Sequence, residues 1–312
     1  MLPIFYDDAF QLHDTGFYHP ENGGRLTAVA AALRAQPWGD QLDWRSPTPV
    51  DRQGDRLTQA LLRVHPRDYL EAVRALSNQG GGQIDPDTPV SPLTYDVARL
   101  AVSAWLDGVD MVHQHQCPAF VLARPPGHHA LAQRGMGFCI FSNAAIAAYY
   151  ALEQAGIQRV AIFDWDVHHG NGTQAIVETH PRLAYCSMHQ YPFYPGTGAP
   201  TEQGHYNNVL NIPMAAGSTI EDYSPRLEQD VIPFLKGFAP DLIIVSAGYD
   251  GNQADPLAGI SLQPRDYGLF TQACLDVSHA VLLGLEGGYD YNTLSQSVVA
   301  TLEACLARVD IT

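Results

Sequence analysis

The sequence has little positive charge, and this scarcity limits the partners that the protein can bind. Its 312 residues include 17 Lys and Arg against 33 Asp and Glu, which gives a formal net charge of −16. Nucleic acids and anionic membranes attract basic surfaces, so we expect neither of them to be a main partner. A cationic or neutral substrate is compatible with this acidic balance.

Closely spaced cysteines and long apolar segments are also missing. The 5 cysteines are far apart, form no Cys-x-x-Cys motif and lie mostly among apolar residues. We therefore expect reduced, buried thiols in a cytoplasmic protein. Met1 leads into a short apolar run without the basic and apolar regions of a signal peptide, and no stretch is long enough to span a membrane.

Apolar residues are plentiful and favour a globular α/β protein. They make up 46% of the chain, while charged residues make up 16%, a composition typical of a packed core. Continuous apolar runs alternate with helical patterns, which indicates a parallel sheet covered by helices on both faces. No repeat, low-complexity tract or linker divides the chain, so we expect one domain over residues 1–312. The predicted strands span residues 2–6, 119–123, 159–163, 183–189, 241–246 and 280–285.

Helical periodicity and breaker residues define the segments between these strands. Residues 80–92 are so rich in Gly, Pro and Asp that we expect no regular structure there. Residues 190–208, rich in Tyr, Pro and Gly, are predicted to form a long functional loop. The predicted helices span residues 25–35, 55–64, 66–76, 93–112, 143–155, 173–178, 220–238 and 264–278, and the end of the chain is also expected to be helical.

The segment FDWDVHHGNGT, residues 163–173, has the densest set of reactive side chains. Because side chains on a strand alternate between its faces, Asp164, Asp166 and His168 start on the same side. They lie at the carboxyl end of a predicted parallel strand, where ligands bind in open α/β sheets. Two carboxylates and an imidazole there could hold a divalent metal, whereas a lone Asp-x-Asp would be read as an acidic turn.

Three other loops that follow predicted strands carry candidate catalytic groups, and all are expected at the same sheet edge. His128 and His129 are adjacent, which suits acid–base chemistry. Either Asp250 or Asp255 could supply a third metal ligand, and Tyr289 could donate a hydrogen bond to an oxyanion. The structural alternatives are locally hydrogen-bonded histidines, an Asx-turn and an aromatic residue packed on the rim of the sheet.

Together these motifs resemble a known family. RPPGHH, GFC, DWDVHHGNGT, YPGTG, AGYD followed by DPLAG, and LEGGY stand in the order and rough spacing of the zinc-dependent histone deacetylases, which include bacterial acetylpolyamine amidohydrolases. The likeness runs nearly end to end and is greatest to the class II branch. It implies the arginase-like fold: one α/β domain with a central, mainly parallel sheet of about eight strands between helical layers. It also implies a narrow channel that ends at zinc.

The resemblance assigns the metal ligands. Asp166, His168 and Asp250 match the three zinc ligands, a set that leaves room for water and a substrate carbonyl. Such oxygen-rich ligands would also accept Fe(II), Mn or Co. His169 is not a ligand in this pattern, and we expect it to be a hydrogen-bonded core histidine. Family members also bind potassium near the zinc, and the matching positions are Asp164, Asp166, His168, Ser187 and Met188, mostly through backbone carbonyls.

The resemblance also implies the catalytic roles. His129 matches the general base that takes a proton from water and then protonates the leaving amine. Asn171 would orient His129, while Asp164 would polarise His128. A carboxylate favours a cationic imidazole more than an amide does, so His129 can stay neutral while His128 assists through its charge. Tyr289 matches the hydroxyl that holds the oxyanion together with zinc.

Five further positions match the surroundings of the substrate in this family. Phe138 and Tyr194 correspond to the aromatic walls of the acyl-lysine channel, and Gly137 precedes Phe138 in the GFC motif. Leu257 corresponds to a position on the channel rim. Arg25 corresponds to a basic residue behind the metal.

The resemblance therefore implies an amidohydrolase that removes acetyl or other small acyl groups from acyl-lysine-like or small amide substrates. An acetylpolyamine amidohydrolase is an alternative, but members specialised for polyamines can carry an acidic gatekeeper where this chain has Leu257. A non-catalytic acyl-amine binding protein is an alternative of another class, and the intact ligands and Tyr289 argue against it. A ureohydrolase of the same fold fits less well, because the motifs for two manganese ions are absent. Whether the protein forms homo-oligomers is left open.

Overall fold

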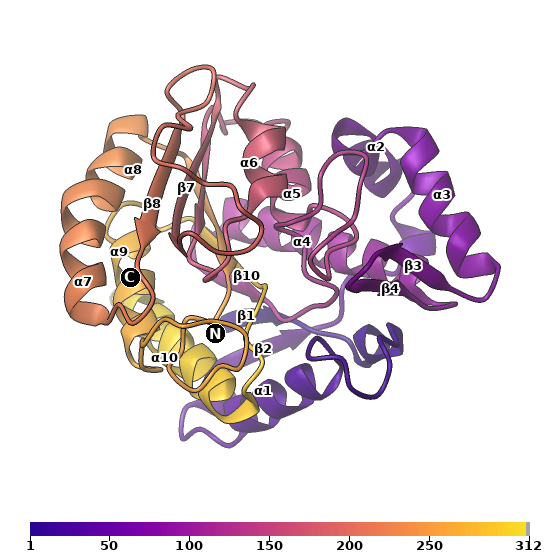
Figure 1. The fold of residues 1–312 in the computed structure, drawn as a ribbon, viewed down its shortest axis with the longest axis horizontal. Coiled ribbons are helices and arrows are strands. Elements are labelled where there is room, and N and C mark those ends of the chain that lie inside the picture. The colour runs from indigo at the N-terminus through magenta and orange to yellow at the C-terminus, as the bar shows by residue number, and fades with distance from the viewer. Residues whose placement is uncertain (310–312) are drawn as a thin grey trace.

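A parallel sheet of eight strands runs through the molecule (Figure 1). The computed structural model describes residues 1–309, and within them every neighbouring strand pair of this sheet is parallel. The prediction of a mainly parallel sheet is confirmed. In spatial order the strands are β2 (Leu42–Arg45), β1 (Leu2–Phe5), β5 (Ala119–Val121), β10 (Val281–Leu285), β9 (Leu242–Ala247), β6 (Val160–Asp164), β7 (Leu183–Gln190) and β8 (Val209–Met214).

Helices cover both faces of the sheet. One layer contains α4 and α5, which contact strands near the centre of the sheet, while α1 and α10 pack together on the other side (Figure 1). The strands β6, β9 and β10 are buried at every position, as expected when both faces are covered. The helices are α1 (Gly24–Arg34), α2 (Asp55–Val64), α3 (Arg67–Asn78), α4 (Thr94–His115), α5 (Asn143–Ala151), α6 (Asn171–Val177), α7 (Ile220–Arg226), α8 (Ile232–Phe238), α9 (Asp266–Leu275) and α10 (Tyr291–Val309).

The predicted helix over residues 220–238 is interrupted. A π-helical turn at Leu227–Val231 separates α7 from α8. Pro225 and Pro233 lie on either side of this turn and cannot donate a backbone hydrogen bond. The loss of these donors accounts for the local change of helical register.

The prediction of no regular structure over residues 80–92 is wrong. Residues Gly82–Asp85 (β3) pair with Thr88–Val90 (β4) as an antiparallel hairpin that turns at Pro86 and Asp87. Proline and aspartate favour tight turns, so the residues that argued against regular structure instead close the hairpin. Asp87 is thereby placed at a fixed position on the surface.

The strands β2 and β8 were not predicted from the sequence. Both lie at the edges of the sheet, where burial is incomplete, and polar residues interrupt β2 while Asn211 and Pro213 interrupt the apolar run of β8. Pro213 within β8 is tolerated because an edge strand has one side without a partner. Over the same residues 1–309, no helix is both long and apolar enough to cross a membrane.

The order of the strands determines which loops meet. The strands β5, β10, β9 and β6 are consecutive neighbours in the sheet, although they are far apart in the sequence. Because they are parallel, their carboxyl ends lie at one edge, and the loops that follow them form a single cluster. This edge carries every strand-end loop in which the sequence indicated a candidate catalytic or metal-binding group.

Candidate active site

Asp166, His168 and Asp250 form a close group of metal-binding side chains. Their ligand atoms all lie within 4.8 Å of one another. The Nδ1 atom of His168 is 3.2 Å from Asp166 Oδ1 and 3.0 Å from Asp250 Oδ2. Both carboxylates are completely buried, while His168 reaches the pocket described below. The predicted ligands are therefore brought together by the neighbouring ends of β6 and β9.

This group fits a divalent cation. Burial alone would lower the pKa of His168, but Asp250 and Asp166 raise it to about 10. The two carboxylates therefore favour a positive charge at this point. One imidazole nitrogen and carboxylate oxygens form a ligand set that Zn²⁺ accepts, and three protein ligands are typical of a catalytic site.

Backbone amides hold both carboxylates in place. Gly287 N donates to Asp166 Oδ2 at 2.8 Å, and Val167 N donates to Asp250 Oδ1 at 2.9 Å. A Cβ atom at position 287 would lie 2.2 Å from Asp250 Oδ2, so only glycine fits there. The LEGGY motif therefore contributes to the metal group through its backbone, which tends to orient and rigidify ligands.

His128 and His129 lie beside this group in different electrostatic surroundings. His128 Nδ1 is 3.2 Å from Asp164 Oδ2, whereas His129 Nδ1 is 2.8 Å from Asn171 Oδ1. Burial would lower the pKa of His128, but Asp166 and Asp164 outweigh it and raise this pKa to about 10. Burial, followed by the charges of His128 and His168, lowers the pKa of His129 well below 6.5. Near neutral pH, His128 is cationic and His129 is neutral.

The amide of Asn171 determines which nitrogen of His129 can accept a proton. Its Oδ1 faces His129 Nδ1, and its Nδ2 lies 3.6 Å from the sulfur of Met136. An amide oxygen only accepts hydrogen bonds, so in this arrangement His129 Nδ1 carries the hydrogen. The lone pair of Nε2 is then free to accept a proton.

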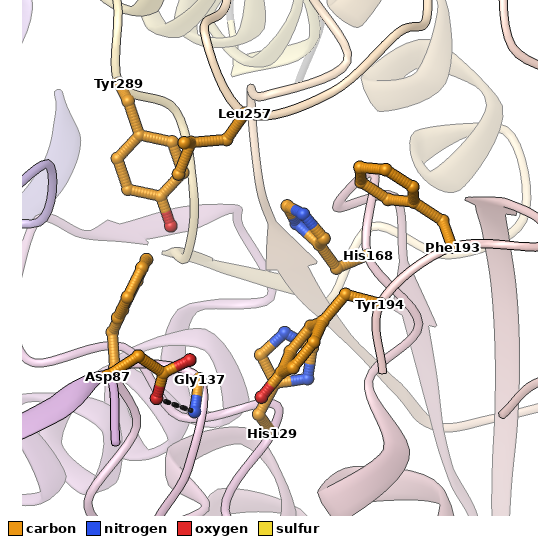
Figure 2. Close-up of a pocket in the computed structure, with 9 residues that line it drawn as sticks. Asp87, His129, Gly137, His168, Phe193, Tyr194, Leu257 and Tyr289 are labelled. Carbon is orange, nitrogen blue, oxygen red and sulfur yellow. Dashed lines mark hydrogen bonds between the residues drawn. The ribbon is translucent and has the colours of Figure 1, made fainter. Parts of the chain in front are cut away.

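A pocket of about 170 Å³ leads to these groups (Figure 2). Asp87 and Phe193 line this pocket without having been predicted. Phe193 precedes the predicted Tyr194 in the same aromatic loop, which was an available signal, whereas Asp87 lies in the hairpin that the sequence did not reveal. The lining residues are Asp87, His129, Gly137, Phe138, His168, Phe193, Tyr194, Leu257 and Tyr289.

The wall at Gly137 and Phe138 has an unusual backbone. Both residues have positive φ, 55° and 69°, and such values are uncommon for phenylalanine. The hairpin holds this turn, because Asp87 Oδ1 accepts from Gly137 N at 3.3 Å and Thr88 Oγ1 accepts from Phe138 N at 3.0 Å. A Cβ atom at position 137 would lie 2.4 Å from the ring of His129, so glycine is required beside the histidine.

Tyr289 directs its hydroxyl into the pocket (Figure 2). Its ring meets Phe138 edge-on at 5.9 Å, and the guanidinium of Arg25 lies 5.0 Å from the ring centroid. Burial, followed by the charge of Asp250, raises the pKa of Tyr289 well above 10, so the hydroxyl stays protonated and can donate. Arg25 is buried behind Tyr289, does not line the pocket, and donates from Nε to Gly288 O at 2.7 Å.

The positions matched to potassium lie next to the metal group. Ser187 pairs with Asp164 in the register between β6 and β7, and both Ser187 and Met188 are buried. His169 faces away from this group. Its two ring nitrogens are 2.7 Å from Thr197 Oγ1 and 2.8 Å from Gln174 Oε1, an arrangement that satisfies a buried histidine.

Comparisons with known proteins agree with the family resemblance of the sequence motifs. Residues 19–305 match the family model described as histone deacetylase domain. The chain is 53% identical to the uncharacterized protein slr0245 of Synechocystis sp., over 98% of the chain and 100% of that protein. It is 40% identical to a histone deacetylase-like amidohydrolase of Pseudomonas aeruginosa, over 73% of the chain and 63% of that protein. The solved HD domain of HDA15 has a TM-score of 0.91 at 33% identity and covers 98% of the chain and 90% of that domain.

Proposed function

Because this chain belongs to the histone deacetylase family, we propose that it is a zinc-dependent amidohydrolase that removes acetyl or other small acyl groups from amines. Acyl-lysine-like and small amide compounds are the proposed substrates. The observation that carries this proposal is that a metal-binding triad, a neutral histidine and a protonated tyrosine meet at one narrow pocket. Hydrolysis of a fluorogenic acetyl-lysine amide by the zinc-loaded protein tests it, and binding without hydrolysis would favour a non-catalytic acyl-amine binding protein.

The side chains of the pocket have separate roles in this reaction. Zinc held by Asp166, His168 and Asp250 would supply Lewis acidity and lower the pKa of water. Nε2 of neutral His129 takes a proton from the attacking water and later delivers it to the leaving amine. The hydroxyl of Tyr289 donates to the oxygen of the amide as negative charge develops there. The products are a free amine and a carboxylate.

Two further proposals concern the surroundings of the reaction. We propose that potassium binds at the carbonyls near Asp164 and Ser187 and stabilises the loop that carries the zinc ligands. The 5 cysteines are all free thiols, which is consistent with a reducing compartment, and we propose the cytoplasm.

Removing a ligand tests the metal assignment. Asp250→Ala takes away one of three protein ligands, so we expect a folded protein with little zinc, detected by elemental analysis and thermal unfolding. Asp266→Ala is the matched control, because Asp266 is also buried but lies outside the metal-binding group. Full zinc occupancy in Asp250→Ala would show that the ligand assignment is wrong.

An acetylpolyamine amidohydrolase is the second candidate, and Asp87 is the observation that favours it. Asp87 is an acidic residue in the lining of the pocket, and a carboxylate there attracts cationic amines. Leu257, in the same lining, offers no charge to a nitrogen in the middle of a polyamine. Values of kcat/KM for acetyl-lysine peptides, acetylputrescine, acetylspermidine and small aryl amides separate the two candidates.

The charge of Asp87 has a measurable consequence. Asp87→Asn keeps an oxygen for the Gly137 amide but removes the charge, so we expect KM for acetylspermidine to rise about two- to fivefold. For a neutral acetyl-lysine amide we expect little change. Asp85→Asn is the control, because Asp85 pairs with Arg134 and does not line the pocket. Equal increases of KM for both substrates would contradict an electrostatic role for Asp87.

A further inference from the structure

Asp255 joins the two loops that carry Tyr289 and Leu257. The loop pattern alone left Asp255 as an alternative third metal ligand, whereas the family resemblance matched Asp250, and the metal-binding group contains Asp250 and not Asp255. Asp255 is only 6% exposed. Its Oδ2 accepts from the backbone N–H of Tyr289 at 2.7 Å, and its Oδ1 accepts from that of Leu257 at 3.0 Å. One buried carboxylate therefore contacts the main chain at two residues of the pocket lining, Tyr289 and Leu257.

The bond to Asp255 completes the support of Tyr289. On the N-terminal side, Gly288 has a φ of 118° and its carbonyl accepts from Arg25. Asp255 holds the next backbone group, the N–H of Tyr289 itself. Hydrogen bonds that a carboxylate accepts are among the strong ones in proteins. The peptide unit between Gly288 and Tyr289 is therefore held through both its carbonyl and its N–H, and the side chain of Tyr289 extends from this support into the pocket.

We propose that Asp255 is a positioning residue that places the hydroxyl of Tyr289 relative to the metal-binding group and couples it to the rim at Leu257. The effect on catalysis rests on the proposed function. The two hydrogen bonds of Asp255, called the tether below, do not depend on it. An oxyanion donor works only within about 2.7–3.1 Å of the developing charge. A small shift of the Tyr289 backbone moves the hydroxyl at the far end of the ring out of this range.

Two substitutions separate this role from general stability. Asp255→Ala removes both acceptor oxygens and therefore both bonds. Asp255→Asn keeps one oxygen, so it can accept from only one of the two amides, that of Tyr289 or that of Leu257. If Asp255→Ala does not fold, Asp255→Asn still carries the test, because one of the two amides must lose its acceptor. Asp266→Asn is the matched control, because Asp266 is equally buried and accepts from Gln263 N at 2.8 Å, away from Tyr289.

Hydrogen exchange measures the tether directly. In the zinc-loaded full chain, we expect peptides that contain the Tyr289 amide to exchange about tenfold faster or more in Asp255→Ala than in the unchanged protein. In Asp255→Asn we expect the same acceleration at the amide of Tyr289 or at that of Leu257. Asp266→Asn should leave both exchange rates as they are. Exchange at both amides that is the same in the Asp255 variants and in the unchanged protein would overturn the proposal. The hydrogen-exchange measurement does not require the protein to be catalytically active.

A double-mutant cycle then tests whether the tether acts through the hydroxyl. Asp255→Ala should lower kcat for an acetyl-lysine amide about tenfold, because small misplacements of a catalytic group are costly. In a Tyr289→Phe background the same change should lower kcat less than about twofold, since no hydroxyl is left to misplace. Zinc content and hydroxamate binding should stay unchanged. A tenfold loss of kcat in both backgrounds would overturn the positioning role of Asp255. If the unchanged protein shows no turnover, the proposed function is wrong, and the hydrogen-exchange result alone then tests whether Asp255 holds the Tyr289 backbone.

Discussion

Replacing His129 with alanine is expected to lower kcat about 10³-fold, within the 10²–10⁴ range that a general acid–base group contributes. The Nε2 of this ring is free to accept a proton, because Nδ1 is engaged by Asn171. His128→Ala should be impaired less, since His128 is held cationic by Asp166 and Asp164 and acts through its charge. The measurement is kcat and kcat/KM for one acetyl-amide substrate over a range of pH.

The pH profile distinguishes the two histidines. A base works only when it is deprotonated, so activity falls as pH drops through its pKa. Burial, followed by the charge of His128, lowers the pKa of His129 below 6.5, so the acidic limb of kcat/KM should lie below pH 6.5. We expect His129→Ala to lose this limb and His128→Ala to keep it. If His128→Ala were inactive and His129→Ala active, the roles of general base and of charged neighbour would have to be exchanged between the two histidines.

Asn171→Asp provides a second check on the same assignment. It places a carboxylate where an uncharged amide now lies 2.8 Å from His129 Nδ1. A nearby negative charge stabilises the imidazolium, so the pKa of His129 rises and the acidic limb moves to higher pH by about one unit or more. If the limb does not move, His129 is not the group whose ionisation it reports.

The second large effect is expected for Tyr289→Phe, which keeps the ring and removes the hydroxyl. Loss of one oxyanion donor typically lowers kcat about 10²–10³-fold. Zinc content and binding of a hydroxamate chelator should survive, because Tyr289 is outside the metal-binding group and its ring contacts with Phe138 and Arg25 remain. Tyr194→Phe is the comparison, since this other tyrosine of the pocket should change kcat far less. Near-normal turnover in Tyr289→Phe would refute the oxyanion role.

Several features of this protein could be predicted from its residues. The buried strands β6, β9 and β10 are continuous apolar runs, so their positions were found to within one or two residues. The ordered motifs identified the histone deacetylase family and the arginase-like fold, and both are confirmed by the family match and the TM-score of 0.91. The single domain over residues 1–312 and the oligomeric state stay predictions.

The strands that were not predicted from the sequence share one feature. The strands β2 and β8 lie at sheet edges and are only partly buried, and the hairpin β3–β4 is short, so none of them is a continuous apolar run. Asp87 was missed for this reason, because a residue in an unrecognised hairpin has no predicted position. Apolar sequence patterns identify strands that are buried on both faces, and they often fail to identify strands that are half exposed.

The sequence by itself determined the chemistry of the site: three carboxylates, three histidines, an amide and a phenol, each beside a strand end or a glycine-rich turn. Only the tertiary structure decided which of these groups meet. The loop pattern alone does not distinguish Asp250 from Asp255, since both are acidic residues of one loop, and only the family resemblance favoured Asp250. The sheet order β5-β10-β9-β6 brings Asp250 to Asp166 and His168, and it turns Asp255 toward the backbone of Tyr289. These contacts join residues that are 34 and 82 positions apart, and they depend on strand pairing, which local sequence patterns do not encode.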